Sequence, residues 1–384
     1  MLKRKFFYWL TISNFLYIIV LLILAGVTIA ALSGDNGILT RASESKGKTE
    51  KAQEKEGVEL AVTSIRMEDM NILEMSKEKL ENAIRQQFGN SKDFDVIDNK
   101  DGSFLVNMND TKRMYYVDDT GLVIAEENML KISTPEELIT FRNDVNSGNT
   151  YKGWYVYLTN DITLDINEEW QPIGIYLNSN TSIDDETNLT FEGIFDGRKH
   201  TIDGMKITSK EKGKGLFGLI KNATIKNLII EENCNINIGV SYGSIVGYAN
   251  IGSTLENCIN KATITLNSTN VGGIIGSIAS NCVIKNCYNT GNLEANLNTG
   301  VAVGGIVGTI APGQTSLENC YNTGNINANS NVGGIAGLIS SGQTSLKNCY
   351  NIGNIKAETT NAGGIVGIAD ASIVINCYNT GNMY

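Results

Sequence analysis

The stretch GGIVGTIAPGQTSLENCYNTGNINANSNVGGIAG, residues 304–337, holds one complete repeat and the start of the next. Its opening GGIVG segment has counterparts on both sides, at spacings of 29 to 32 residues, and LENCYNTGN-like segments recur between them in phase. A fixed period of this length predicts a solenoid. The five segments of the first type are GSIVG (243–247), GGIIG (272–276), GGIVG (304–308), GGIAG (333–337) and GGIVG (363–367).

The composition of the repeat predicts β coils rather than helices. Each unit combines Gly pairs, Asn, Thr and β-branched residues, and no unit holds a run of ten helix formers. We interpret GGIVGTI, SLENCYN and NINANS as three short strands that make one coil of a right-handed parallel β-helix. About seven coils, stacked about 4.8 Å apart, would form a rod. The predicted fold class is therefore mainly β, and the presence of only 3 Pro residues fits strands that must all donate hydrogen bonds.

The Gly and Asn residues of the repeat have predicted roles in the turns. Gly at a bend of the coil supplies a positive φ or permits a close approach of backbone. Asn tolerates left-handed turn geometry, and equivalent amides on successive coils would form a ladder. These positions are Gly273, Gly305, Gly334 and Gly364 for the turns, and Asn257, Asn286, Asn319, Asn348 and Asn376 for the ladder.

Five of the seven cysteines recur once per coil: Cys258, Cys287, Cys320, Cys349 and Cys377. A disulfide ladder, a metal site and a small buried apolar side chain are the three alternatives. In the divergent coil IKNLII, Leu228 takes the cysteine position, and leucine can replace cysteine only in packing. Stacking also holds Cβ atoms about 4.8 Å apart, whereas a disulfide prefers roughly 3.8 Å. We therefore predict core packing, which requires a bend between Leu317 and Cys320 if both face inward.

The repeat continues upstream in divergent form. GLFG (215–218) with IKNLII (225–230) predicts one coil, and GIFDG (193–197) with HTIDGMKI (200–207) predicts another. WYVYLTNDITL (154–164) predicts the first strand region.

A helix is predicted directly before this first strand region, in TPEELITFRNDVNSG. Thr134 is the expected N-cap, Glu137 closes a capping box and Gly148 ends the helix. Leu138, Phe141 and Val145 line one face. Such an amphipathic helix is suited to cover the open end of a β-helix.

A membrane span is predicted at residues 6–32, which carry no charge and follow the basic MLKRK start. About 20 such residues cross a bilayer, and the basic flank predicts a cytoplasmic N-terminus with the bulk of the chain outside. A cleavable signal peptide, cut near Thr28 and Ala30, is the alternative, although its apolar region normally has about 7 to 15 residues. We predict a retained anchor.

Between the span and the repeats, the pattern predicts a long helix and a small α+β module. Val58, Ala61, Val62 and Ile65 fall at helical spacing. A second helix is expected from Ser76 as N-cap to Gly89 as its stop. FDVID, SFLVNM, KRMYYVD and GLVIA then predict an antiparallel meander. The predicted division of the chain is residues 1–66, residues 67–128 and the β-helix at residues 129–384.

The N-terminal region resembles the type IV pilin and pseudopilin family over residues 18–65, where an apolar helix runs into an amphipathic one before a small sheet. The resemblance implies a pilin-like anchor or a filament subunit. Prepilins carry a Gly before the cleavage site and a Glu five residues after it, and MLKRKFFYWLTISNFLYIIV contains neither. A membrane anchor with a stalk and a filament subunit therefore both stay open.

The repeats resemble the GLUG family of glycine-rich repeats over about residues 130–384, through the in-phase pairing of GGIVG with NCYNTGN. The family occurs in bacterial surface proteins and in the non-catalytic part of IgA-specific metallopeptidases. The resemblance implies a surface-displayed β-helix of adhesin type. It implies no peptidase activity, because the sequence has no HExxH motif.

Composition excludes several classes of function. A formal charge of -10 without a basic stripe argues against nucleic-acid binding. A single histidine, His200, leaves no metal site with two His ligands, and we predict no metal and no cofactor.

The last repeat stops at NCYNTGNMY, so its coil would offer an open edge for a homo-oligomer or fibre unless the sequence is a fragment.

Some parallel β-helices are polysaccharide lyases or hydrolases, which need paired carboxylates or a carboxylate cluster with Ca²⁺. Residues 239–384 contain nine charged side chains, and the acids are not grouped in equivalent positions of neighbouring coils. We interpret two groups of residues as turns, namely the acidic loop Asp184, Asp185, Glu186 and the triplet Asp196, His200, Asp203.

We predict a non-enzymatic cell-surface display or adhesion protein that contacts a glycan or a protein. The alternatives are a pilus-like fibre subunit and a secreted carbohydrate-active enzyme.

Overall fold

The computed structural model describes residues 38–384 apart from 69–74, 101, 177–186, 209–211, 238–239, 267–269, 296–301, 341 and 371. The chain divides into two compact units, Met1–Glu126 and Glu127–Tyr384. Each unit has its own buried apolar cluster.

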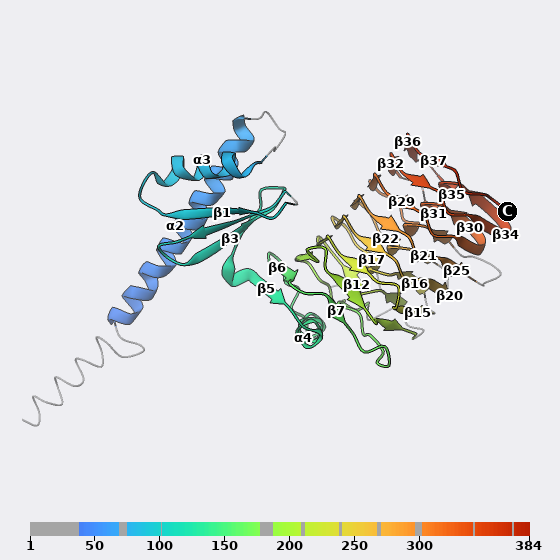
Figure 1. Cartoon of the computed structure of the whole chain (residues 1–384), viewed down its shortest axis with the longest axis horizontal. Coiled ribbons are helices and arrows are strands. Elements are labelled where there is room, and N and C mark those ends of the chain that lie inside the picture. Colours follow the sequence, from blue (N-terminus) through green and yellow to red (C-terminus); the bar gives the residue numbers. More distant parts are fainter. Residues whose placement is uncertain are drawn as a thin grey trace, which may run out of the picture. The chain divides into compact units, whose positions relative to one another are not determined.

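The first unit packs two helices against a four-stranded antiparallel sheet of order β1-β2-β3-β4 (Figure 1). The predicted stripe of the long helix faces this sheet, since Val58, Ala61, Val62 and Ile65 are all buried. The second helix begins after Ser76, whose side chain accepts a hydrogen bond from the Lys79 amide, and ends before Gly89 at φ 58°. The elements are α2 (Ile38–Glu68), α3 (Lys77–Phe88), β1 (Phe94–Asp98), β2 (Phe104–Met108), β3 (Arg113–Val117) and β4 (Val123–Ala125).

The predicted membrane span lies outside the described residues, because these begin at Ile38. Within the described part of the chain, no helix combines the length and apolarity that a membrane crossing needs. Of the segment that resembles pilins, only the portion within α2 is described.

The second unit is a parallel β-solenoid (Figure 1). Its eight-stranded sheet receives one strand from each coil, and the seven steps from the first strand to the last give about seven turns. Its strands stack into four parallel sheets. The nine-stranded sheet contains β5 (Met129–Ile132), β6 (Tyr155–Leu158), β8 (Ile194–Asp196), β13 (Thr224–Lys226), β18 (Thr254–Glu256), β23 (Val283–Lys285), β28 (Ser316–Glu318), β32 (Ser345–Lys347) and β36 (Ile373–Ile375). The eight-stranded sheet contains β7 (Ile162–Thr163), β9 (Thr201–Asp203), β14 (Ile229–Ile230), β19 (Ile259–Asn260), β24 (Tyr288–Asn289), β29 (Tyr321–Asn322), β33 (Tyr350–Asn351) and β37 (Tyr378–Asn379).

The other two sheets complete each coil. The six-stranded sheet contains β12 (Phe217–Ile220), β17 (Val246–Ala249), β22 (Ile275–Ile278), β27 (Val307–Ile310), β31 (Ala336–Ile339) and β35 (Val366–Ala369). The ten-stranded sheet contains β10 (Lys206–Ile207), β11 (Lys212–Lys214), β15 (Asn235–Asn237), β16 (Val240–Gly243), β20 (Ile264–Leu266), β21 (Asn270–Gly272), β25 (Leu293–Ala295), β26 (Ala302–Gly304), β30 (Ile326–Gly333) and β34 (Ile355–Gly363).

The core of the solenoid is built from in-register apolar columns. Ile284 of β23 pairs with Leu317 of β28, which pairs with Leu346 of β32, and all three are fully buried. The expectation that SLENCYN forms one strand was wrong: the chain bends at Asn319, so the segment contributes β28 to one sheet and β29 to the next.

A helix covers the first coils of this core, as the sequence predicts. In α4 (Pro135–Val145), Leu138, Phe141 and Val145 are buried, and the Phe141 ring lies 5.6 Å from that of Phe191. Thr134 caps the helix by accepting a hydrogen bond from the Glu137 amide. The Glu137 carboxylate accepts one in return from the Ser133 amide, and the helix closes at Asn146, two residues before the expected stop. A short 3-10 turn, η1 (Glu126–Asn128), precedes this region.

Candidate interaction surface

The five repeating cysteines form one inward column of the solenoid. Cys258, Cys287, Cys320 and Cys349 are fully buried, and Cys377 is partly exposed. Leu228 of the divergent coil occupies the equivalent place and is also fully buried. Cys234 and Cys282 lie elsewhere in the core, and all seven thiols are free.

Burial and local hydrogen bonds hold these thiols in the core. Each thiol of the column donates to the carbonyl two residues before it, as in Cys320 to Glu318 O at 3.4 Å and Cys349 to Lys347 O at 3.4 Å. Burial raises the pKa of the Cys287 thiol well above its ordinary value and that of Cys282 to about 11. A protonated, buried thiol is a poor nucleophile and a poor metal ligand. Among the described residues, no group of three or more His, Cys, Asp or Glu is placed to hold a metal ion.

The five predicted ladder asparagines all stand at the bend before this column, with φ of 52° to 54°. Their side chains connect neighbouring coils: Asn319 donates to Asn286 at 3.3 Å, Asn348 to Asn319 at 3.1 Å and Asn376 to Asn348 at 3.3 Å. Asn257 donates in the same sense to Asn227 of the preceding coil. The left-handed backbone conformation of Asn319 bends the chain, so that both Leu317 and Cys320 face the core.

A second asparagine ladder, which the sequence reasoning missed, runs inside the solenoid. Asn260, Asn289 and Asn322 each donate at 2.7 Å to the next coil's equivalent asparagine, and Asn351 donates to Asn379 at 2.6 Å. The second amide proton of each goes to the carbonyl two residues on, as in Asn322 to Gly324 O at 2.8 Å. These amides are therefore buried without an unmet donor, as a low-dielectric core requires.

The predicted turn glycines pack directly against this inner ladder. A Cβ on Gly305 would lie 2.6 Å from the Cβ of Asn322, and one on Gly334 would lie 2.5 Å from that of Asn351. Gly273 faces Asn289 and Gly364 faces Asn379 in the same way. None of the four has a positive φ. Glycine is therefore needed at these positions for the close approach of neighbouring atoms and not for left-handed backbone geometry.

A column of tyrosines runs along the outside of the eight-stranded sheet. We define the tyrosine column as Tyr288, Tyr321, Tyr350 and Tyr378, which are in register on β24, β29, β33 and β37. Successive ring centroids lie 4.0, 4.8 and 5.2 Å apart, with interplanar angles of 24°, 10° and 4°. The first three are half-buried and Tyr378 is 53% exposed. The rings therefore form one stack that runs along the solenoid.

The charged side chains beside the tyrosine column are paired across neighbouring coils. On the nine-stranded sheet, Lys285 binds Glu256 at 3.0 Å and Lys347 binds Glu318 at 3.5 Å. On the other flank, on the two coils that precede Tyr288, Lys261 binds Glu231 at 2.8 Å. The surface around the tyrosines thus carries balanced charge.

The candidate catalytic triplet does not converge. Asp196 is buried, where it accepts hydrogen bonds from Tyr155 at 2.9 Å and Asn227 at 3.0 Å. His200 instead pairs with Asp161 at 3.1 Å, and Asp203 binds Asn233 at 3.0 Å. The three side chains have separate structural partners, and the acidic loop of Asp184, Asp185 and Glu186 lies outside the described residues.

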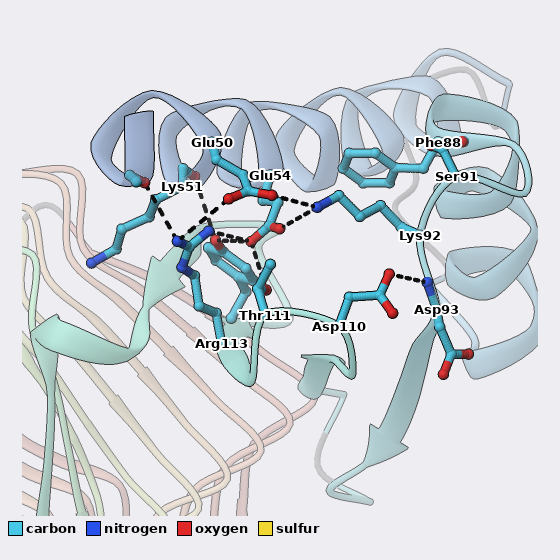
Figure 2. A network of polar contacts seen from close by, with 12 residues as sticks. Glu50, Lys51, Glu54, Phe88, Ser91, Lys92, Asp93, Asp110, Thr111 and Arg113 are labelled. Carbon is cyan, nitrogen blue, oxygen red and sulfur yellow. Dashed lines mark hydrogen bonds and ion pairs between the residues drawn. The ribbon is translucent and has the colours of Figure 1, made fainter. Parts of the chain in front are cut away.

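The first unit contains a buried carboxylate that the sequence reasoning also missed. Glu54, on α2 and 1% exposed, binds Lys92 at 2.7 Å, and it also binds Arg113, Thr111 and Tyr115 at 3.1 Å each (Figure 2). Burial alone would raise its pKa, but hydrogen bonds from Lys92 and Arg113 hold the pKa of the Glu54 carboxyl below its ordinary value. The cluster fastens α2 to β3 and to the segment before β1.

Comparison with known proteins identifies the repeats. The model of the GLUG motif matches residues 267–294 and 358–383, and each match includes an NCYNTGN segment. The β-solenoid thus contains two segments that match the GLUG motif. The curated proteins give no significant match.

A solved structure shares the fold. It is the crystal structure of a Bacteroides ovatus protein that is provisionally described as an immunoglobulin A1 protease. The similarity has a TM-score of 0.53 at 22% identity, and it covers 66% of this chain and 76% of that chain. At this identity the likeness establishes the shared fold alone.

Proposed function

We propose that this protein is a cell-surface display and adhesion protein, in which a pilin-like membrane helix at residues 6–32 anchors a β-solenoid that contacts a glycan or another protein. The observation that carries the proposal is the repetition of the same outward side chains from coil to coil, above all the tyrosine column. Such a surface presents equivalent groups at regular intervals, which suits contact with an extended partner.

The contents of the core support display rather than chemistry. The buried polar columns are asparagines that bind one another, and burial raises the pKa of the Cys282 and Cys287 thiols. The members of the candidate triplet Asp196, His200 and Asp203 are each held by a structural partner. We therefore propose no enzymatic activity, and we do not extend the activity named for the Bacteroides ovatus protein to this chain, whose sequence has no HExxH motif.

A pilus-like subunit is the second candidate, because a specific observation favours it. The long helix α2 lays its apolar stripe on an antiparallel sheet and is fastened there by Glu54. A helix held along a small sheet is the arrangement that the resemblance to pilins implies for the segment after the membrane span. Under this proposal the solenoid would be displayed on a fibre instead of on single anchors.

One experiment separates these candidates. The mature N-terminus of the chain is determined by mass spectrometry in the producing cell. An end within residues 1–20 supports pilin processing, an end near residue 31 supports secretion, and an intact start supports the anchor.

A binding experiment tests adhesion. Cells that display the full chain are compared with cells that lack it, for attachment to purified cell-wall glycan. Attachment that depends on the chain, without change in the size of the glycan, is expected. Shortening of the glycan would instead favour a carbohydrate-active enzyme.

A further inference from the structure

We infer that the tyrosine column binds a linear, neutral, β-1,4-linked polysaccharide that lies parallel to the solenoid axis, with one sugar per coil. The inference rests on the proposed adhesive function and narrows its partner to one chemical class. Four observations carry it: the spacing of the rings, their free edges, the balanced charge around them and the polar character of the flank that follows them.

The spacing of the column matches an extended glycan. Successive rings from Tyr288 to Tyr378 stand 4.0, 4.8 and 5.2 Å apart, because strands of stacked coils are separated by about 4.8 Å. A β-1,4-linked hexose polymer advances by nearly the same distance per sugar. A chain of such sugars can therefore place one sugar on every coil and, because successive sugars are flipped, repeat the same contact on every second coil, which a compact or branched ligand cannot do.

The orientation of the rings determines the kind of contact. Interplanar angles of 24° or less mean that neighbouring rings cover each other's faces. The phenol edges are then the accessible part of the column. Within the described residues, no hydrogen bond engages the phenol oxygens of Tyr288, Tyr321 or Tyr350, so these groups can donate to and accept from sugar hydroxyls.

The phenols of Tyr288 and Tyr350 stay protonated at neutral pH. Burial is the largest cause that raises the pKa of Tyr288, and the neighbouring Tyr321 adds to it. Burial and the phenols on either side raise the pKa of Tyr350 likewise. Both side chains therefore keep the donor that a sugar hydroxyl needs.

The charge around the column favours a neutral ligand. Glu256 with Lys285, Glu318 with Lys347, and Glu231 with Lys261 pair across neighbouring coils at 2.8 to 3.5 Å. A polyanion binds through an excess of cations, and this surface offers none in the columns that flank the tyrosines. A neutral sugar chain needs no excess of charge to bind such a surface.

The flank that follows the tyrosines also favours a glycan over a protein. On the side that follows each tyrosine, the outward residues are Thr290, Thr323 and Thr380, with Ile352 as the one apolar member. The core of a protein interface is usually apolar and depleted of charge. In addition, the inner strands of the column, such as β29, pair on both sides, so they offer no free edge to a peptide strand.

The test measures binding of the full chain in detergent to β-1,4-linked glucose oligomers and N-acetylglucosamine oligomers of two to eight sugars, by calorimetry. The test variant is the double substitution Tyr321→Phe and Tyr350→Phe, which keeps the ring stack and removes two hydroxyls. The matched control is Tyr157→Phe, a half-buried tyrosine on β6 outside the column. A thermal melt shows whether each variant stays folded.

We expect the affinity for at least one series to rise several-fold with each added sugar up to about four sugars, one for each tyrosine, and then to level off. The double variant should bind the four-sugar oligomer about tenfold or more weakly, since each lost hydrogen bond accounts for several-fold. Tyr157→Phe should bind as the wild type does. Melting temperatures should differ little among the three proteins.

Several outcomes would overturn the inference. They are an absence of binding to both neutral series, affinity that does not depend on length, an unchanged double variant, or tighter binding to polygalacturonate than to the neutral oligomers. If displaying cells attach to cell wall or to a protein partner equally well with the double variant, adhesion stands and the tyrosine column is not its site. If cells that display the wild-type chain attach no better than cells that lack it, the result would instead count against the proposed function itself.

Discussion

Gly305 lies so close to the buried amide of Asn322 that a Cβ on the glycine would stand 2.6 Å from both Cβ and Cγ of the asparagine. It would also stand 2.1 Å from the carbonyl oxygen of Gly334 on the next coil. The two segments that define the repeat, GGIVG and NCYNTGN, therefore meet in space. The glycine leaves room for the asparagine, and the asparagine bonds the coils to each other.

The first prediction concerns this close approach. Gly305→Ala should destabilise the solenoid by about 1–3 kcal/mol, because backbone on the next coil and the Asn322 side chain must both move. Chemical denaturation followed by circular dichroism measures the loss. Gly47→Ala on α2 is the matched control, since a Cβ there has no neighbour within 4 Å and alanine is the better helix former by about 1 kcal/mol. Equal stability of Gly305→Ala and wild type would contradict the packing argument.

The second prediction concerns the inner ladder. Asn322→Ala removes the acceptor of Asn289 and the donor of Asn351, both buried. Leaving such groups unsatisfied costs about 1–3 kcal/mol. Asn327→Ala, at an exposed outward position of β30, should change stability by less than about 0.5 kcal/mol. If both variants melt alike, the inner ladder does not stabilise the coils.

The sequence predicted the solenoid because the period, the glycines and the β-branched residues all repeat in phase. It did not reveal that the repeat holds two asparagine ladders, although Asn recurs three residues after each ladder position. Both look alike in the sequence, since asparagine is common in turns. Only the bend at Asn319 shows that Asn322 faces inward while Tyr321 faces out.

The third prediction concerns that bend. Asn319 has φ 53°, a region that costs most residues roughly 1–2 kcal/mol and glycine almost nothing. Asn319→Ala should therefore lower stability by about 1 kcal/mol or more, and Asn319→Gly by clearly less. The comparison separates backbone strain from the loss of the side-chain bond to Asn286, which both variants share. A glycine variant as unstable as the alanine variant would assign the effect to the hydrogen bond.

The fourth prediction concerns the thiols. In the native protein, a thiol reagent should label at most Cys377, which is partly exposed, while the six buried cysteines stay unlabelled at neutral pH. After unfolding in denaturant without a reductant, all seven should react. Mass spectrometry of the labelled peptides identifies each site. Recovery of fewer than about five thiols from the unfolded chain would indicate disulfides and would refute core packing.

In the first unit, the sequence predicted both helices and the meander from apolar spacing and capping residues, yet it gave no sign of the Glu54 cluster. Glu54 lies in a segment rich in Glu and Lys, where a buried carboxylate looks like any exposed one. Its partners Lys92 and Arg113 are 38 and 59 residues away. Such a long-range polar contact has no periodic signature, so only the folded arrangement reveals it.

The last prediction concerns this cluster and pH. Because the pKa of Glu54 is lowered in the folded state, its contribution to stability is complete above its unfolded value of about 4.3 and is lost as the pH falls through the lower folded value. Glu54→Gln should cost roughly 1.5–3 kcal/mol at pH 7 and show a weaker loss of stability below about pH 4. Glu50→Gln, at a partly exposed carboxylate 3.2 Å from Lys92, should cost less than about 1 kcal/mol. Urea unfolding monitored by helical circular dichroism between pH 3 and 7 measures both, and parallel pH profiles for Glu54→Gln and wild type would show that the buried carboxylate does not fasten α2.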